Sequence, residues 1–105
     1  MSHVFSRDFI DSEKLDPIPS HLLAWAKKDL RETLEEDLPK ADKALKQAER
    51  ELAFLLRDLS HRKIDPEKSD EVQFLEQMCT ASRLKMEFYD GKVHLLKKRI
   101  ALSNS

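Results

Sequence analysis

Cys79 is the residue of this chain whose type most readily does chemistry, because a thiolate can act as a nucleophile or bind a metal. A reactive thiol needs an electropositive and partly open setting. Cys79 instead stands between Leu75 and Met86 in a row of mostly apolar residues at helical spacing. We therefore expect a small buried side chain without a catalytic role. As the sole cysteine it cannot form a disulfide within the chain, which favours a reducing compartment, the cytoplasm.

Two Asp–His pairs have a spacing that could bind a metal ion. Asp58 precedes His61 by three residues and Asp90 precedes His94 by four, so each pair lies on one face of a helix. A di-metal site in a helical bundle needs two carboxylate-x-x-His motifs and two further carboxylates. The two pairs would lie about 40 Å apart along an antiparallel pair of helices, too far to share an ion within one chain. We predict solvated side chains here, and no metal, cofactor or catalytic residue.

The single glycine excludes the common motifs of nucleotide-binding and hydrolytic enzymes. Phosphate-binding loops, dinucleotide fingerprints and nucleophile elbows each need several glycines close together. The formal net charge of -1 provides no global field that would attract nucleic acid or an anionic membrane. No apolar run approaches the roughly 20 residues that span a bilayer. We therefore predict a protein that is not an enzyme, has no membrane span and binds neither nucleic acid nor membranes.

The elements that position these residues are long helices. The chain is 37% charged and 7% aromatic, with one Gly and four Pro, a composition typical of solvated helices. In the second half, mostly apolar residues follow one another in alternating steps of three and four. This heptad seam consists of Val72, Leu75, Cys79, Ser82, Met86, Tyr89, Val93, Leu96 and Ile100. A helix with such a seam needs another helix to cover it.

A second seam in the first half continues through Pro39 without a change of register. It consists of Leu34, Leu38, Ala41, Leu45, Ala48, Leu52, Leu55 and Leu59. Because a reversing turn would have no reason to preserve that register, we predict one helix over about residues 20–62, kinked at Pro39. The alternative ends a helix near Glu36 and begins another at Leu38, which gives a three-helix up-down-up bundle.

Asp65-Pro66-Glu67 has the residue types of a helix start, and predicts a last helix over about residues 66–102. The predicted fold is all-α, a long antiparallel helical hairpin that resembles a coiled coil. Facing residues should then have numbers that add to about 129, which places Gly91 opposite Leu38 and Pro39. It also places the basic Lys92, Lys97, Lys98 and Arg99 opposite the acidic Glu32, Glu35, Glu36 and Asp37. We predict a single helical domain over residues 20–105, preceded by an extended arm over residues 1–19.

Apolar residues outside the seams indicate where a partner would bind. A second stripe on the last helix, with Phe74 and Phe88 as its largest members, needs a neighbour of its own. Trp25 lies off the seam, and either packs on the arm at the end of the bundle or is exposed as an interface anchor. The predicted partner-binding residues are Phe5, Phe9, Ile10, Trp25, Phe74, Met78, Ala81, Phe88 and Leu95.

Together these patterns favour a non-enzymatic protein–protein interaction module in the cytoplasm. Helical hairpins of this size serve as adaptors, scaffolds and small assembly or secretion chaperones, an analogy of architecture alone. We expect a homodimer that also binds a protein partner whose identity the sequence does not give. The alternative is a small helical bundle that binds a metal or cofactor at a dimer interface, where symmetry would supply the missing ligands.

Overall fold

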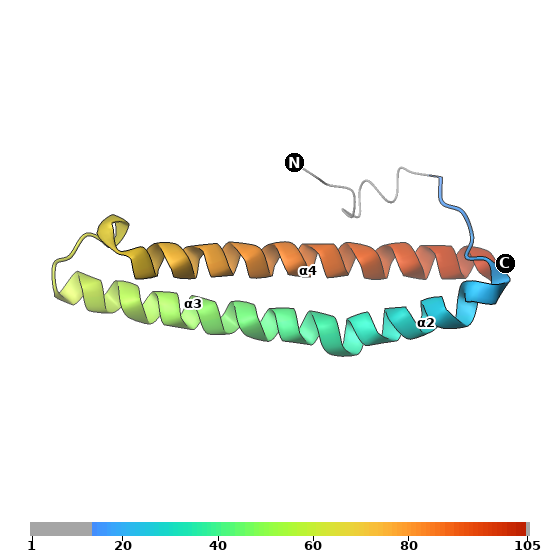
Figure 1. Ribbon diagram of the computed structural model, residues 1–105, viewed down its shortest axis with the longest axis horizontal. Coiled ribbons are helices and arrows are strands. Elements are labelled where there is room, and N and C mark those ends of the chain that lie inside the picture. The colour runs from blue at the N-terminus through green and yellow to red at the C-terminus, as the bar shows by residue number, and fades with distance from the viewer. Residues whose placement is uncertain (1–13, 105) are drawn as a thin grey trace. The chain divides into compact units, whose positions relative to one another are not determined.

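The computed structural model describes residues 14–104, and the regular structure within that range is helical. In chain order the elements are the 3-10 helix η1 (Ser20–Leu22), α2 (Leu23–Glu32), the π-helix η2 (Thr33–Asp37), α3 (Leu38–His61), the 3-10 helix η3 (Pro66–Lys68) and α4 (Asp70–Ser103) (Figure 1). The backbone stays helical from Ser20 to His61, reverses, and returns as α4. The predicted all-α helical hairpin is therefore confirmed, and the three-helix bundle is wrong.

The chain divides into two compact units. The first comprises Met1–Pro39 and Met86–Ser105, and the second comprises Lys40–Lys85. Helix α4 belongs to both units as one continuous helix. Residues 14–19, the described part of the predicted arm, have no regular secondary structure. The arm as a whole and the single domain over residues 20–105 stay predictions.

The reversal lies in the second unit and begins with a Schellman motif at the end of α3. The amide of Ile64 donates to the carbonyl of Leu59 at 3.0 Å, and that of Lys63 donates to Ser60 at 3.1 Å. This motif requires a left-handed residue, and Lys63 supplies it with a φ of 58°. A non-glycine residue there costs about 1 kcal/mol, which the two backbone hydrogen bonds offset.

The segment that leads into α4 is capped as its sequence predicts. The side chain of Asp65 accepts a hydrogen bond from the Glu67 amide at 3.0 Å, and Pro66 occupies the first position of η3. Helix α4 itself begins four residues later than Pro66, where the hydroxyl of Ser69 accepts from the Val72 amide at 3.3 Å. The predicted start signal is thus used for a short 3-10 turn that leads into α4.

Both predicted seams provide the core of the second unit. On α3 the buried residues are Ala41, Ala48 and Leu59, and on the α4 side they are Val72, Cys79 and Ser82. Small residues dominate this set, so the two backbones can approach closely. Cys79 is only 2% exposed, which confirms its predicted burial.

In the first unit, the helix accommodates Pro39 by a π turn. The amide of Leu38 donates to the carbonyl of Thr33, five residues back. Such a turn is wider than an α turn, and it relieves the clash between a proline ring and the carbonyl four residues before it. The extra residue rotates Thr33 into the core at 0% exposure and turns Leu34 outward to 40% exposure. The prediction that Leu34 belongs to the seam is therefore wrong.

The register of the first unit also differs from the predicted one. Asp29 pairs with Lys92 at 3.0 Å, and the numbers of these two residues add to 121 rather than 129. In the predicted register residue 100 would face Asp29, so the observed contact lies eight residues from the predicted one. The pairing of Gly91 with Leu38 stays a prediction.

Three residues of the predicted charged runs have partners other than the predicted ones. Lys92 pairs with Asp29, and the Nε of Arg99 donates to the carbonyl of Asp16 at 2.9 Å. Glu32, from the acidic run, lies 3.9 Å from Lys28 on its own helix.

The segment before η1 docks on the end of α4. Ile18 is buried in a small core with Ala26, Leu96 and Ile100. The hydroxyl of Ser103 accepts from the Ile18 amide at 2.6 Å and lies 3.0 Å from the Ile18 carbonyl, to which it can donate. The described end of the arm therefore packs on the chain's own helices rather than extending toward a partner.

Candidate protein-binding surface

The candidate metal-binding side chains do not form a metal site within the described residues. Among residues 14–104, no group of three His, Cys, Asp or Glu side chains lies close enough to bind a metal ion. Asp58, one of the two candidates on α3, faces Arg62 at 3.4 Å. The shape of the surface and the exposed apolar side chains therefore indicate where a functional site lies.

A groove in the second unit runs between α3 and α4. It is lined by Arg50, Glu51, Phe54 and Leu55 of α3 and by Glu71 and Leu75 of α4. Leu55 and Leu75 are half-buried, because both also belong to the seams that hold the two helices together. Phe54 is 75% exposed, the most exposed large apolar side chain among the described residues. The groove is shallow and open, and its lining combines the apolar Phe54, Leu55 and Leu75 with the charged Arg50, Glu51 and Glu71.

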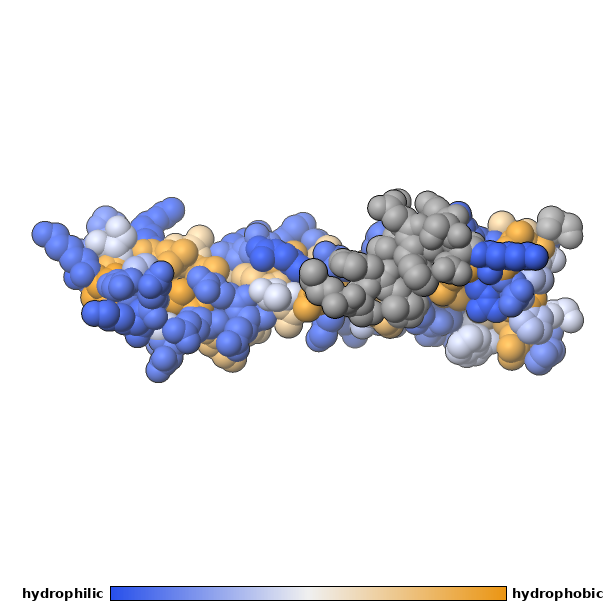
Figure 2. All heavy atoms as spheres, turned by 90° about the horizontal axis from the view of Figure 1, so that it is seen from above, coloured by the Kyte–Doolittle hydropathy of each residue, from blue (hydrophilic) through white to orange (hydrophobic). Residues whose placement is uncertain are grey.

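A stripe of α4 beside this groove is also apolar and exposed. Phe74 is 61% exposed and Met78, one turn later, is 40% exposed. Ala81 follows at helical spacing and is exposed as well. Figure 2 shows apolar side chains gathered near the α3–α4 reversal, with hydrophilic side chains around them. Phe54, Phe74 and Met78 thus lie on one unit, and each would lose water on contact with a partner.

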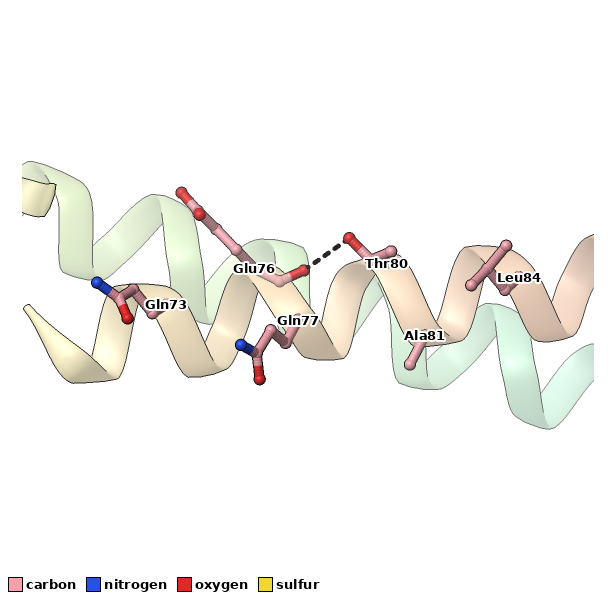
Figure 3. A pocket seen from close by; sticks show the side chains of 6 residues that line it. All are labelled: Gln73, Glu76, Gln77, Thr80, Ala81 and Leu84. Carbon is pink, nitrogen blue, oxygen red and sulfur yellow. Dashed lines mark hydrogen bonds between the residues drawn. The ribbon is translucent and has the colours of Figure 1, made fainter. Parts of the chain in front are cut away.

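The next face of α4 forms a shallow furrow on a single helix. It is lined by Gln73, Glu76, Gln77, Thr80, Ala81 and Leu84 (Figure 3). The hydroxyl of Thr80 donates to the carbonyl of Glu76 at 3.1 Å, so its proton is used within the helix. All six residues are exposed, and the furrow is an open part of the outer surface of α4 rather than a ligand cavity.

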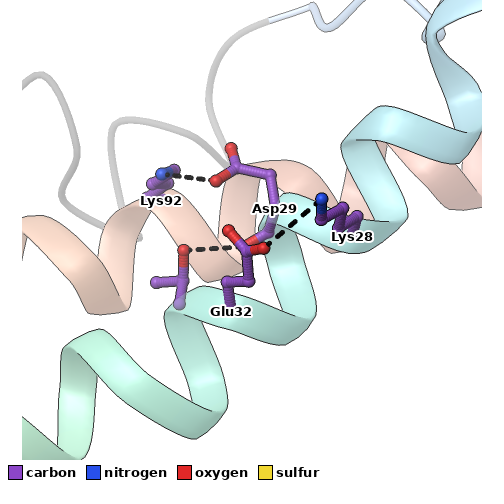
Figure 4. Close-up of polar contacts among 5 residues, drawn as sticks. Lys28, Asp29, Glu32 and Lys92 are labelled. Carbon is purple, nitrogen blue, oxygen red and sulfur yellow. Dashed lines mark hydrogen bonds and ion pairs between the residues drawn. The ribbon is translucent and has the colours of Figure 1, made fainter.

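Polar contacts in the first unit hold α2 against α4. The Asp29–Lys92 ion pair is the more enclosed of the two pairs in this region, with side chains 22% and 27% exposed. The Lys28–Glu32 pair lies within one helix and is open to water. The hydroxyl of Thr33 donates to the Asp29 carbonyl at 2.8 Å, which ties the π turn to the same place (Figure 4). These contacts are structural, since each of the four charges in the two pairs has a partner within the chain.

The predicted partner-binding residues are distributed over both units. Trp25 is 64% exposed, so the interpretation that it packs at the end of the bundle is wrong and the exposed alternative holds. In the same unit, Leu95 is half-buried and the ring of Phe88 lies edge-on to Tyr89 at 5.7 Å. Phe74, Met78 and Ala81 lie together on the second unit. The remaining three, Phe5, Phe9 and Ile10, lie outside the described residues. That these residues bind a partner stays a prediction.

Phe54 is the site residue that the sequence interpretation missed. It stands in the apolar run Ala53-Phe54-Leu55-Leu56, where Leu55 belongs to the seam and Phe54 lies beside it, off the seam. A large aromatic residue away from the seam is the signal that could have identified it.

No known protein-family model, curated protein or solved structure matches this chain. Within residues 14–104, each helix is too short or too polar to cross a lipid bilayer.

Proposed function

We propose that this chain is a non-enzymatic protein–protein interaction module that binds a protein partner through the exposed apolar surface of its second unit. The observation that carries the proposal is the exposure of two phenylalanines, Phe54 at 75% and Phe74 at 61%, beside a groove with charged walls. Aromatic side chains, Met and Arg are enriched at protein interfaces, and Arg50, Phe54, Phe74 and Met78 supply all three kinds.

The exposed phenylalanine side chains are large enough to stabilise a complex when a partner covers them. Covering one exposed phenylalanine removes on the order of 100 Å² of apolar surface from water, which stabilises a complex by about 2.5 kcal/mol. Two such anchors reach the range of interface hot spots. Neither exposed ring contributes much to folding, so binding offers a reason for their presence that packing within the chain does not.

The proposal includes a cytoplasmic location, association of two copies of the chain, and a role as an adaptor, scaffold or assembly or secretion chaperone. It does not include binding to nucleic acid or membranes. The partner is expected to present apolar side chains to Phe54, and the second copy of the chain to Phe74. The partner should also carry charges that complement Arg50, Glu51 and Glu71 at the walls of the groove.

Site-specific photo-crosslinking in the native host tests the proposal. A photoreactive phenylalanine analogue replaces Phe54 in one variant and, as a matched control, Lys43 in another, an exposed residue of the same helix and unit. We expect a discrete adduct with another protein at position 54 that is absent at position 43. The substitution Phe74→Glu should remove that adduct, because the charge lies beside the groove. Equal labelling at positions 54 and 43 would contradict the proposed function.

Isothermal titration with the purified, identified partner then measures the contribution of the ring. We expect Phe54→Ser to weaken binding by at least tenfold, which corresponds to about 1.4 kcal/mol. Because the side chain is 75% exposed, the same variant should change the free energy of unfolding by less than about 0.5 kcal/mol. A large loss of stability would show that Phe54 is a folding residue instead.

A further inference from the structure

The exposed stripe on α4 is complementary to itself when read in reverse. Its members follow one another in steps of three and four within the second unit: Glu71, Phe74, Met78, Ala81 and Lys85. An acid stands at one end, a base at the other, a large and a small apolar residue lie between, and a methionine is at the centre. This stripe is separate from the buried seam of Val72, Cys79 and Ser82 on the same helix.

We infer that a second copy of this chain packs on the stripe in antiparallel orientation, with a two-fold axis at Met78. Residues whose numbers add to about 156 then face each other. Glu71 meets Lys85 of the partner subunit, and Phe74 meets Ala81 of the partner subunit. By symmetry each pairing occurs twice, as an isologous interface requires.

Size and charge both favour this arrangement over the parallel one. A large ring opposite a small alanine fills the space between helices without a clash, and methionine adapts its shape at the axis. In a parallel pair of stripes, Glu71 would lie beside Glu71, Lys85 beside Lys85 and the two phenylalanine rings would compete for one space. Like charges at such positions disfavour a pairing.

The charged ends of the stripe are also available for the contact. Glu71 and Lys85 are both exposed, and within residues 14–104 neither takes part in an ion pair. A second copy would supply a partner of opposite charge to each. The inference rests on the association of two copies that the proposed function includes, and it does not depend on the binding of another protein at the groove.

Charge exchange between the two ends tests the register in the full-length protein. Sedimentation velocity across roughly 1 to 500 µM gives the dimer dissociation constant. The salt concentration is held near 0.15 M so that distant charges are screened. We expect Glu71→Lys and Lys85→Glu, each alone, to raise that constant about tenfold, because each places two pairs of like charges across the axis. The double variant should restore the wild-type constant.

A mixture of the two single variants tests the register more strictly than either variant alone. In an antiparallel heterodimer every facing pair is again of opposite charge, so the equimolar mixture should dimerise as well as the wild type. Lys43→Glu and Glu49→Lys form the control set, since they change the net charge equally at exposed positions of α3. Circular dichroism confirms that each variant keeps its helices, which matters because Glu71 stands in the first turn of α4.

The outcomes separate the inference from the broader proposal. A wild type that is monomeric throughout the concentration range overturns both the inference and the association of two copies. A dimer that does not respond to the substitutions, or is not restored in the mixture and the double variant, overturns the inference alone. Equal effects in the control set would likewise overturn it, because net charge and not register would then explain the result.

Discussion

Replacing Ser103 by alanine should release the segment that precedes η1. The Ser103 hydroxyl accepts a hydrogen bond from the Ile18 amide at 2.6 Å. Its single proton can go either to the Ile18 carbonyl at 3.0 Å or to the Arg99 carbonyl at 2.9 Å, so the hydroxyl makes two hydrogen bonds at any moment. Each contributes a net 0.5–1.5 kcal/mol, roughly. The site is only partly buried and water can replace part of the loss, so we expect the docked state to lose about 1–2 kcal/mol.

Hydrogen exchange at the Ile18 amide, followed by NMR, measures this loss directly. Protection should fall about tenfold for each 1.4 kcal/mol, while amides in the middle of α4 keep theirs. The segment should not detach completely, because Ile18 still packs against Leu96 and Ile100. Ser60→Ala is the matched control, an exposed serine near the end of α3. Unchanged exchange of the Ile18 amide in Ser103→Ala would refute the view that the hydroxyl holds the segment.

Two further predictions concern the interior of the two units. A double-mutant cycle of Asp29→Asn and Lys92→Met, read from urea unfolding, should give a coupling of about 1 kcal/mol that decreases with added salt, because this pair is less than one third exposed. A coupling near zero would mean that the pair does not hold α2 on α4. Cys79→Ala should cost about 1 kcal/mol through the small cavity it leaves, and the native thiol should react slowly with a thiol reagent, since it is 2% exposed. Labelling as fast as in urea would contradict the burial.

The fold class could be predicted because it depends on patterns along single helices. Each helix can be identified without reference to the other. The signals are the seams in steps of three and four, the start signal at Asp65 and a composition with only one glycine. The register between the two helices of the hairpin depends on side chains from both of them. If one helix slides along the other by two turns, apolar seam residues still face apolar seam residues. Polar contacts such as that of Asp29 with Lys92 join two different helices, and the spacing of residues along one helix does not predict them.

The exchange of Thr33 for Leu34 in the core has a local cause that the sequence also contains. The sequence identifies Pro39 as the disturbance and predicts a bend at the proline itself. The chain instead forms a π turn over Thr33–Asp37, so the seam shifts by one position before the proline is reached. As a result Leu34 is 40% exposed and Thr33 is 0% exposed, although hydrophobicity alone predicts that the leucine is the buried residue of the two. Backbone geometry therefore decided which side chain was buried.

The two surfaces of the second unit also differ in this way, because one is formed by a single helix and the other by two helices. The stripe from Glu71 to Lys85 belongs to one helix, so its spacing, its charges and its likeness to its own reverse can all be read from the sequence. The groove around Phe54 is made by α3 and α4 together, and it becomes visible only when the two helices are in register. A surface for a second copy of the chain can arise from one helix because symmetry supplies the other half. A surface for a different protein has no such constraint, so the groove requires the packed structure to identify it.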